Sequence, residues 1–247
     1  MKKQKNNTNL LLYGHHAVIE ALKNPNRQKL CLKAIKESVP SKQITQNVPV
    51  QIVSKDALNA LVGNDAVHQG LVLETKNLPA VSLEDIIDRT QDAQSAMVVL
   101  LDQVTDPHNI GAILRSAAAF DAKALILADA NAPEETGVLA KSACGALEII
   151  PLVRVANLVR AMEKLKQAGF WCIGLDGYAK QMINDKPLPK KSAFVMGAEG
   201  DGMRRLTAET CDYTVKLPMS NKMESLNVSN AAAITMFEWY KNFESDW

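Results

Sequence analysis

Long apolar runs alternate with amphipathic stretches in the part of the chain after residue 95. The runs AMVVLLD (96–102), ALILAD (124–129) and SAFVMG (192–197) are almost wholly apolar, as are strands that a parallel sheet buries on both faces. Between them, IGAILRSAAAFDA and NLVRAMEKLKQAG repeat apolar residues three and four positions apart, which predicts helices. The alternation predicts an α/β domain with a doubly wound parallel sheet over residues 95–247.

The first 79 residues show a shorter alternation. KLCLKAI (29–35), VPVQIVS (48–54) and GLVLET (70–75) predict strands, and AVIEALKN and KDALNALVG predict helices. Residues 1–79 are therefore expected to form a small α/β domain. The sequence Asn77-Leu78-Pro79 interrupts the pattern, and a helix capped by Ser82 follows, which predicts a linker over residues 80–94.

Three unusual loops follow predicted strands of the second domain, at the edge where doubly wound sheets bind ligands. The first, Leu101–Arg115, turns at Asp106-Pro107 and enters a helix with Asn109 near its start. Arg115 is either a solvated helix residue or a cation aimed at a site. Its apolar neighbours on the helix favour the second interpretation, and a guanidinium can hold a phosphate with two parallel donors.

The second loop lies within Phe194–Met203 and reads Gly-Ala-Glu-Gly-Asp-Gly. Gly197, Gly200 and Gly202 allow the backbone to approach a ligand closely. Their spacing is the reverse of the dinucleotide fingerprint, which the chain does not contain, and this argues against a nucleotide-dependent oxidoreductase. Glu199 serves either as a hydrogen-bond acceptor that shapes the turn or as a catalytic carboxylate.

The third loop, Leu217–Asn230, follows a short predicted strand and leads into an Ala-rich helix expected from Ala231 to about Phe243. One of Ser225, Asn227 and Ser229 is enough to cap that helix. Three alternating polar side chains exceed what a cap requires, and this favours a functional site in the loop.

Composition narrows the class of protein. Of 247 residues, 47% are hydrophobic and 22% are charged, as in soluble globular proteins. No apolar run approaches the roughly 20 residues of a membrane span, and the LLLY segment after the basic N-terminus is too short for a signal peptide. A cytoplasmic protein is expected. The four cysteines and four histidines form no ligand pattern, so no metal is expected.

Charge is unevenly placed along the chain. Residues 1–79 carry 11 Lys or Arg and 5 Asp or Glu, a net charge of +6, whereas the remainder carries 17 and 22, a net charge of −5. Such asymmetry indicates that the first part meets a polyanion. Alternatively, part of the excess belongs only to a Lys-rich tail.

The three loops together resemble the motifs of the SpoU/TrmH branch of the SPOUT RNA methyltransferases. The similarity lies in TDPHNIGAILRSAAAF, FVMGAEGDGMRRL and SLNVSNAAAITMFE, with KSACGALEIIPLVRV between them. In the first domain, YGHHAVIEAL and AVHQGLVLE are similar to the RNA-recruiting domain of family members that modify large-subunit rRNA. The resemblance therefore covers nearly the whole chain.

This resemblance implies a fold and a cofactor. The C-terminal sheet would be tied in a deep trefoil knot, an exception to un-knotted topology. S-adenosyl-L-methionine would bind in the knot, held by Gly197, Gly200, Leu217, Ser225 and Leu226. The family acts as a homodimer, which the Ala-rich face of the last helix suits.

The resemblance also implies an activity, methylation of a ribose 2′-hydroxyl in RNA, with a guanosine of large-subunit (23S) rRNA as the expected target. Arg115 would be the central catalytic residue, gripping phosphate and stabilising the developing oxyanion. Asn109, Glu199, Ser225 and Asn227 would position the ribose and the loops.

In the first domain, His16 and Gln69 either contact RNA, together with Arg115, or pack within that domain. Two alternative functions remain open from the sequence: a tRNA 2′-O-methyltransferase, and a non-catalytic RNA-binding or ribosome-assembly protein.

Overall fold

A computed structural model describes residues 9–129, 133–220 and 222–243 and divides the chain into two compact units. The first unit comprises Met1–Pro79 together with Glu134–Glu148, and the second comprises Ala80–Pro133 and Ile149–Trp247. The sequence analysis counted residues 134–148 with the second domain, whereas their contacts group them with the first. Each unit is described by itself.

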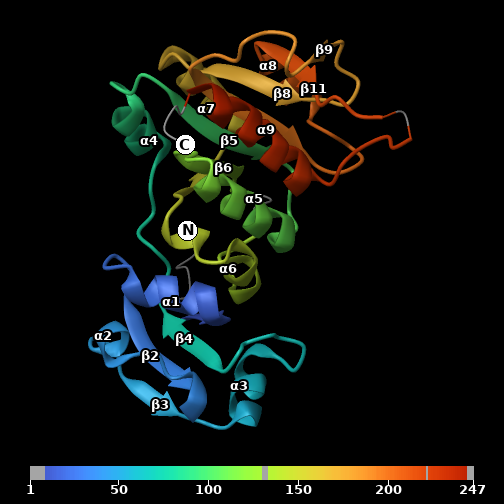
Figure 1. Ribbon diagram of the computed structural model, residues 1–247. Coiled ribbons are helices and arrows are strands. Elements are labelled where there is room, and N and C mark those ends of the chain that lie inside the picture. The colour runs from blue at the N-terminus through green and yellow to red at the C-terminus, as the bar shows by residue number, and fades with distance from the viewer. Residues whose placement is uncertain (1–8, 130–132, 221, 244–247) are drawn as a thin grey trace, which may run out of the picture. The chain divides into compact units, whose positions relative to one another are not determined.

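The first unit is built on a four-stranded sheet of order β1-β4-β2-β3 (Figure 1). Its strands are β1 (Leu10–Tyr13), β2 (Lys29–Ala34), β3 (Val50–Ile52) and β4 (Leu71–Thr75). Its helices are α1 (His15–Lys23), α2 (Lys42–Thr45), α3 (Lys55–Val62) and α6 (Gly137–Ala143). The predicted alternation of helix and strand is confirmed. The β1 strand was not predicted, because four consecutive apolar or aromatic residues show no period.

A buried ion pair holds the segment 134–148 in the first unit. The Arg27 side chain has no exposed surface, and its Nη2 lies 2.5 Å from Oε1 of Glu148. The same guanidinium donates to the carbonyl of Lys76 at 2.9 Å. A Cβ on Gly137 would lie only 2.5 Å from the Leu11 carbonyl oxygen, so α6 approaches β1 as closely as glycine allows. The contacts of Arg27 with Glu148 and of Gly137 with Leu11 join residues more than a hundred positions apart.

The second unit contains a seven-stranded sheet of order β7-β6-β5-β10-β8-β11-β9, and every ladder in it is parallel. The strands are β5 (Ala96–Asp102), β6 (Ala124–Ala128), β7 (Leu152–Val155), β8 (Trp171–Leu175), β9 (Gln181–Met182), β10 (Lys191–Gly197) and β11 (Tyr213–Lys216). All seven residues of β5 are buried, as expected of a strand covered on both faces. The predicted doubly wound α/β class is confirmed.

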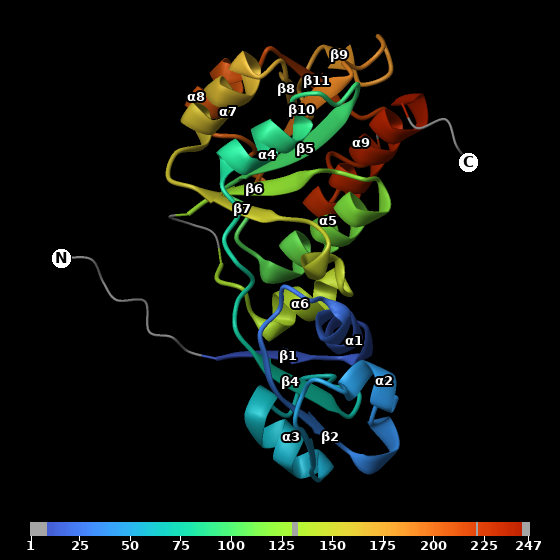
Figure 2. The ribbon, with the colours of Figure 1, turned by 90° about the vertical axis from the view of Figure 1, so that its left-hand side faces the viewer.

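Helices cover both faces of this sheet (Figure 2). They are α4 (Leu83–Thr90), α5 (Pro107–Ala119), α7 (Leu158–Gln167), α8 (Arg205–Thr210) and α9 (Val228–Phe243). Residues Ala96, Val98 and Leu100 of β5 belong to the core formed with α4 and α7. Since side chains alternate along a strand, the intervening β5 residues face the other layer, where α5 and α9 pack together.

Strand register brings the predicted loops to one edge. Gly197 of β10 pairs with Asp102 of β5, and Leu175 of β8 pairs with both Met196 and Val215. Parallel strands that end level with one another release their loops side by side. The loops after β5, β10 and β11 therefore meet, and a turn after β8 joins them.

Within the described parts of the chain, no helix has the length and the apolar character needed to cross a membrane.

Candidate functional site

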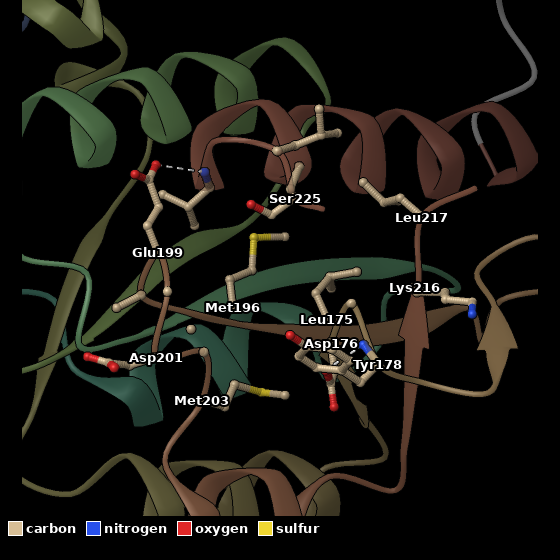
Figure 3. Close-up of a pocket in the computed structure, with 18 of the residues that line it drawn as sticks. Leu175, Asp176, Tyr178, Met196, Glu199, Asp201, Met203, Lys216, Leu217 and Ser225 are labelled. Atoms are coloured by element: carbon tan, nitrogen blue, oxygen red, sulfur yellow. Dashed lines mark hydrogen bonds between the residues drawn. The ribbon is translucent and has the colours of Figure 1, made fainter. Parts of the chain in front are cut away.

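A cavity of about 490 Å³ opens at this edge of the sheet (Figure 3). Its lining comes from the ends of β8, β10 and β11, from the loops that follow them, and from residues of α8 and α9. All the residues predicted to bind a cofactor line it, namely Gly197, Gly200, Leu217, Ser225 and Leu226. Its volume falls within the roughly 300–1,000 Å³ of pockets that hold a small ligand.

The glycine-rich loop folds back tightly on the end of β10. The backbones of Ala198 and Gly202 exchange two hydrogen bonds, of 3.1 and 3.0 Å. A Cβ on Gly197 would lie 2.0 Å from the Gly202 carbonyl carbon, so only glycine fits there. Gly200 and Gly202 have φ angles of 85° and 67°, which side chains rarely allow. The turn thereby presents Glu199 at its tip.

A buried carboxylate fastens the far end of this loop. Asp102, the last residue of β5, is fully buried. Its Oδ2 accepts the backbone N–H of Arg204 at 2.8 Å, and its Oδ1 accepts the Arg204 Nε–H at 2.8 Å. Nη2 of the same guanidinium lies 2.7 Å from Oδ1. The sequence analysis missed both residues, although a charged residue closing an apolar strand was a usable signal.

The Asn227 side chain joins all three predicted loops. Its Nδ2 donates to Oδ1 of Asn109 at 3.0 Å and to Oε1 of Glu199 at 2.5 Å. The same Glu199 oxygen accepts the backbone N–H of Val228 at 3.2 Å. Asn109, Glu199 and Asn227 thus form one hydrogen-bonded cluster, in which Glu199 accepts two hydrogen bonds from the third loop.

Asn227 also caps the last helix. Its Oδ1 accepts the backbone N–H of Ser229 at 2.9 Å, a common use of Asn before a helix. The helix α9 consequently begins at Val228, three residues before the predicted start at Ala231. The prediction from the Ala-rich segment missed residues 228–230, because this first turn of the helix is not Ala-rich.

The remaining predicted catalytic residues occupy different places. Ser225 is exposed and lines the cavity beside Leu226. Arg115 is exposed in the second half of α5 and does not contribute to the lining of the cavity. The structure therefore brings Ser225 to the cavity and leaves Arg115 on the α5 surface.

The turn after β8 was not predicted as part of the site. Asp176 and Tyr178 line the cavity from this turn, and Tyr178 is 97% exposed. Asp-Gly after an apolar run is ordinary turn chemistry, so nothing in the sequence singled it out.

The cysteines near the site are unsuited to nucleophilic chemistry. Burial raises the pKa of both Cys172 and Cys211 to about 12, so both thiols stay protonated near neutral pH. Among the residues that the structure describes, no group of three or more His, Cys, Asp and Glu side chains is placed to hold a metal ion.

In the first unit, Gln69 is exposed and its side chain is hydrogen-bonded within the unit. Its Oε1 accepts the backbone N–H of His15 at 2.8 Å and lies 3.4 Å from Nζ of Lys141. Its φ angle is 53°, in the left-handed region. His16 is exposed, and its ring meets that of His15 edge-on at 5.6 Å. The structure leaves both His16 and Gln69 exposed, and an RNA contact by either residue stays a prediction.

Comparison with known proteins identifies two matching families. The SpoU rRNA Methylase family matches residues 96–237, and the family described as RNA 2′-O ribose methyltransferase substrate binding matches residues 11–81. The two matches leave out residues 82–95 between them.

Individual relatives agree with these matches. The chain is 41% identical over 237 residues to the 23S rRNA (guanosine-2′-O-)-methyltransferase RlmB of Pseudomonas putida, covering 92% of this chain and 94% of the relative. It is 40% identical to the RlmB of Vibrio cholerae over 94% and 96% of the two chains. The crystal structure of the SpoU methyltransferase AviRb from Streptomyces viridochromogenes, in complex with AdoMet, superposes with a TM-score of 0.81 at 25% identity, covering 97% of this chain and 92% of AviRb.

Proposed function

Because this chain belongs to the SpoU rRNA methylase family, we propose that it methylates the ribose 2′-hydroxyl of a guanosine in 23S rRNA, using S-adenosylmethionine. One observation carries the proposal. Two of the three predicted loops line one cavity, and a single side chain, Asn227, joins both to the first loop by its hydrogen bonds to Asn109 and Glu199. A protein that only bound RNA would have no need of such a cavity.

The residues of the cavity fit the cofactor. Leu175, Met196 and Leu217 supply apolar walls, and Gly197 and Gly200 leave backbone exposed to the ligand. A cofactor pocket commonly combines an apolar lining with a few polar groups. When bound there, S-adenosylmethionine supplies a methyl group already activated by its sulfonium, so the protein has chiefly to align the reactants and exclude water.

We assign three roles to the predicted catalytic residues. Asn109, Glu199 and Asn227 hold the loops in register through their hydrogen-bonded cluster. Ser225 lies on the cavity wall, where it positions the ribose. Arg115 grips the target phosphate and stabilises the developing oxyanion. It does not act as the base, because a guanidinium keeps its proton near neutral pH and therefore cannot accept another.

RNA capture belongs, in this proposal, to the first unit. Its family match is a substrate-binding family, and basic residues predominate over residues 1–79. Three of those charges, Lys2, Lys3 and Lys5, lie outside the described residues. His16 and Gln69 are the exposed candidates for an RNA contact, and residues 80–94 link the two functions.

We also propose that the chain works as a cytoplasmic homodimer. Ile234 and Phe237 leave 43% and 44% of their surface exposed on α9, and Phe237 contacts Phe120 with ring centroids 5.8 Å apart. Arg115 lies on the neighbouring α5 and does not line the cavity of its own chain. In the proposed dimer, Arg115 of one copy would meet the cavity of the other copy. The deep trefoil knot remains a prediction from the family.

The proposal is tested by transfer of labelled methyl groups to separately supplied 23S rRNA and tRNA, followed by mapping of the alkali-resistant linkage. We expect label at one guanosine 2′-oxygen of 23S rRNA. Label in tRNA alone would contradict the proposed substrate, and absence of transfer to either RNA would contradict the proposed activity.

The role of Arg115 has its own test. Replacing Arg115 with Ala should abolish turnover while leaving the Kd for S-adenosylmethionine within about twofold, because the side chain lies outside the cavity lining. Titration calorimetry measures the second quantity. Loss of cofactor binding in this variant would refute the assigned role.

A further inference from the structure

One buried residue, Asp102, fastens the glycine-rich loop at both of its ends. Gly197, where the loop leaves β10, lies opposite Asp102 in the ladder between β10 and β5. Arg204, where the loop reaches α8, places its backbone N–H and two guanidinium nitrogens on the Asp102 carboxylate, at distances of 2.8, 2.8 and 2.7 Å. Both ends of the loop are therefore held by the same residue.

The first loop also begins at this residue. Asp102 is the last residue of β5, and the chain turns away at Gln103, whose φ angle is 63°. Residues other than glycine seldom adopt this left-handed conformation, and it persists where the surrounding structure over-determines it. The loop that starts here carries Asn109 and Arg115. Asp102 therefore stands at the stem shared by the first and second loops.

The contact between the two side chains has a defined geometry. The Asp102 side chain has no exposed surface, whereas that of Arg204 is 47% exposed. A buried carboxylate has lost its hydration, which hydrogen bonds to both of its oxygens must replace. Oδ2 accepts the backbone N–H of Arg204, and Oδ1 accepts two N–H groups of the planar guanidinium. A lysine ammonium lacks this planar fork, so the arginine fixes direction as well as distance.

The pair reaches the cavity only through the loop that it closes. Neither Asp102 nor Arg204 lines the cavity, but the loop carries Glu199 and Met203, which lie along one side of it in Figure 3. Glu199 accepts a hydrogen bond from the Asn227 side chain, which also donates to Asn109 of the first loop. The first and second loops are thus joined at two points, the stem and the tip.

We propose that Asp102 and Arg204 form a positioning clasp, which keeps the tip of the glycine-rich loop, and with it Glu199, aligned with the first loop during methyl transfer. The inference rests on the proposed function. The clasp touches neither reactant, and it acts by fixing the stem from which both loops leave. A displacement of about 1 Å at the reacting groups can cost about a hundredfold in rate.

Arg204→Lys tests the clasp with little disturbance of the fold, since it keeps a positive charge opposite Asp102 and the backbone N–H of residue 204. On the full chain, kcat for methyl transfer to 23S rRNA should fall at least about tenfold, while the KM for RNA stays within about twofold, because alignment is lost and RNA binding is not. Arg205→Lys is the matched control. Arg205 is the next residue, its side chain is 84% exposed, and it pairs with Glu209 on the surface of α8. Its kcat should equal that of the wild type.

Hydrogen exchange tests the clasp without any turnover. The backbones of Ala198 and Gly202 pair within the loop. In the chain alone, their amides should exchange about tenfold faster in Arg204→Lys than in the wild type, since the stem no longer limits opening of the loop. Arg205→Lys should leave both rates unchanged.

A double-variant cycle separates positioning from a merely structural role. Glu199→Gln alone should lower kcat by weakening the cluster at the loop tip. Because Arg204 acts through Glu199, combining Arg204→Lys with Glu199→Gln should lose no more than the larger of the two single losses. Independent damage to the fold would instead multiply them.

The pair of changes Asp102→Asn and Arg204→Gln provides a second background for the same test, because it leaves no unpaired charge in the interior. Its kcat should fall at least as far as that of Arg204→Lys. Circular dichroism of the same samples gives the folded fraction, by which each kcat is divided.

A wild-type kcat per folded molecule in these variants would overturn the clasp, as would unchanged amide exchange or losses that multiply in the cycle. Failure of the proposed function looks different, because the wild-type chain itself would transfer no methyl group to RNA.

Discussion

At the scale of single residues, Asn227 combines two separable tasks. Its oxygen caps α9 and its Nδ2 joins Asn109 to Glu199. Other side chains can perform the first task, since Ser caps helices about as well as Asn. The second requires an amide that both donates and reaches two acceptors. The residue therefore links helix stability to loop alignment, and substitution can separate the two effects.

Replacing Asn227 with Ala should lower the free energy of unfolding by about 1 kcal/mol through loss of the cap. Asn227→Ser should retain most of that stability. Both variants should lose methyl transfer by about a hundredfold, because unlinked loops misplace the reactants. Thermal unfolding and transfer rates measured on the same samples separate the effects, and a Ser variant with full activity would show that the bridge is dispensable.

His68 gives the first unit a dependence on pH. It is buried, its Nδ1 accepts the Gly70 N–H at 3.0 Å, and its Nε2 lies 3.0 Å from Oδ1 of Asn59. These partners require the neutral ring with the proton on Nε2. Burial, followed by the charges of Lys55 and Lys141, lowers its pKa from the ordinary value of 6.5.

The sign of the effect follows from this lowered pKa. The unfolded chain binds the His68 proton more tightly, so the first unit should keep its stability above pH 6.5 and lose it progressively as the pH falls toward the lowered folded pKa. Hydrogen exchange of the β4 amides at pH 7.5 and 5.5 measures this loss. His68→Gln should reduce the difference between the two values, and an unaltered difference would assign the pH dependence to other groups.

At the scale of elements, the glycine-rich loop depends on its close return to β10. Gly197→Ala would place a methyl group 2.0 Å from the Gly202 carbonyl carbon, where backbone must move. We expect a loss of about 1–3 kcal/mol in the free energy of unfolding, as for other overpacked sites. Urea denaturation measures it.

Gly177 provides the matched control for this substitution. A Cβ there would meet no atom within 4 Å, and its φ angle lies outside the left-handed region. Gly177→Ala should therefore change stability by no more than about 0.5 kcal/mol. Equal losses in the two alanine variants would show that the close return of the loop does not set its stability.

Sequence periodicity predicted the elements of the second unit well, for a physical reason. A strand buried on both faces, such as β5, must be apolar throughout, and amphipathic helices such as α7 must show their period. The two-residue β9 was missed, because so short a strand has no period. The three loops were found because glycines and short polar side chains mark turns, whereas Asp102 and Arg204 are joined across 102 positions, which local patterns do not reveal.

At the scale of the whole molecule, the proposed homodimer makes a quantitative prediction. Ile234→Glu places a charge on the exposed apolar face of α9 and should raise the dimer Kd at least about tenfold, since an isologous interface contains the change twice. Analytical ultracentrifugation measures the association. Leu206→Glu is the control, because Leu206 is also exposed, at 58%, but lies on α8. A wild-type chain that sediments as a monomer would refute the proposed dimer.

The segment Glu134–Glu148 sets a limit on how the two units can be exchanged. It leaves the second unit after β6, pairs Glu148 with the buried Arg27, and returns to form β7. Deleting residues 1–79 would strip this segment of its partners, so truncation would perturb more than RNA capture. A hybrid enzyme that takes its RNA-binding unit from a relative must inherit residues 134–148 from the same relative. The two units therefore cannot be exchanged independently at this point of the chain.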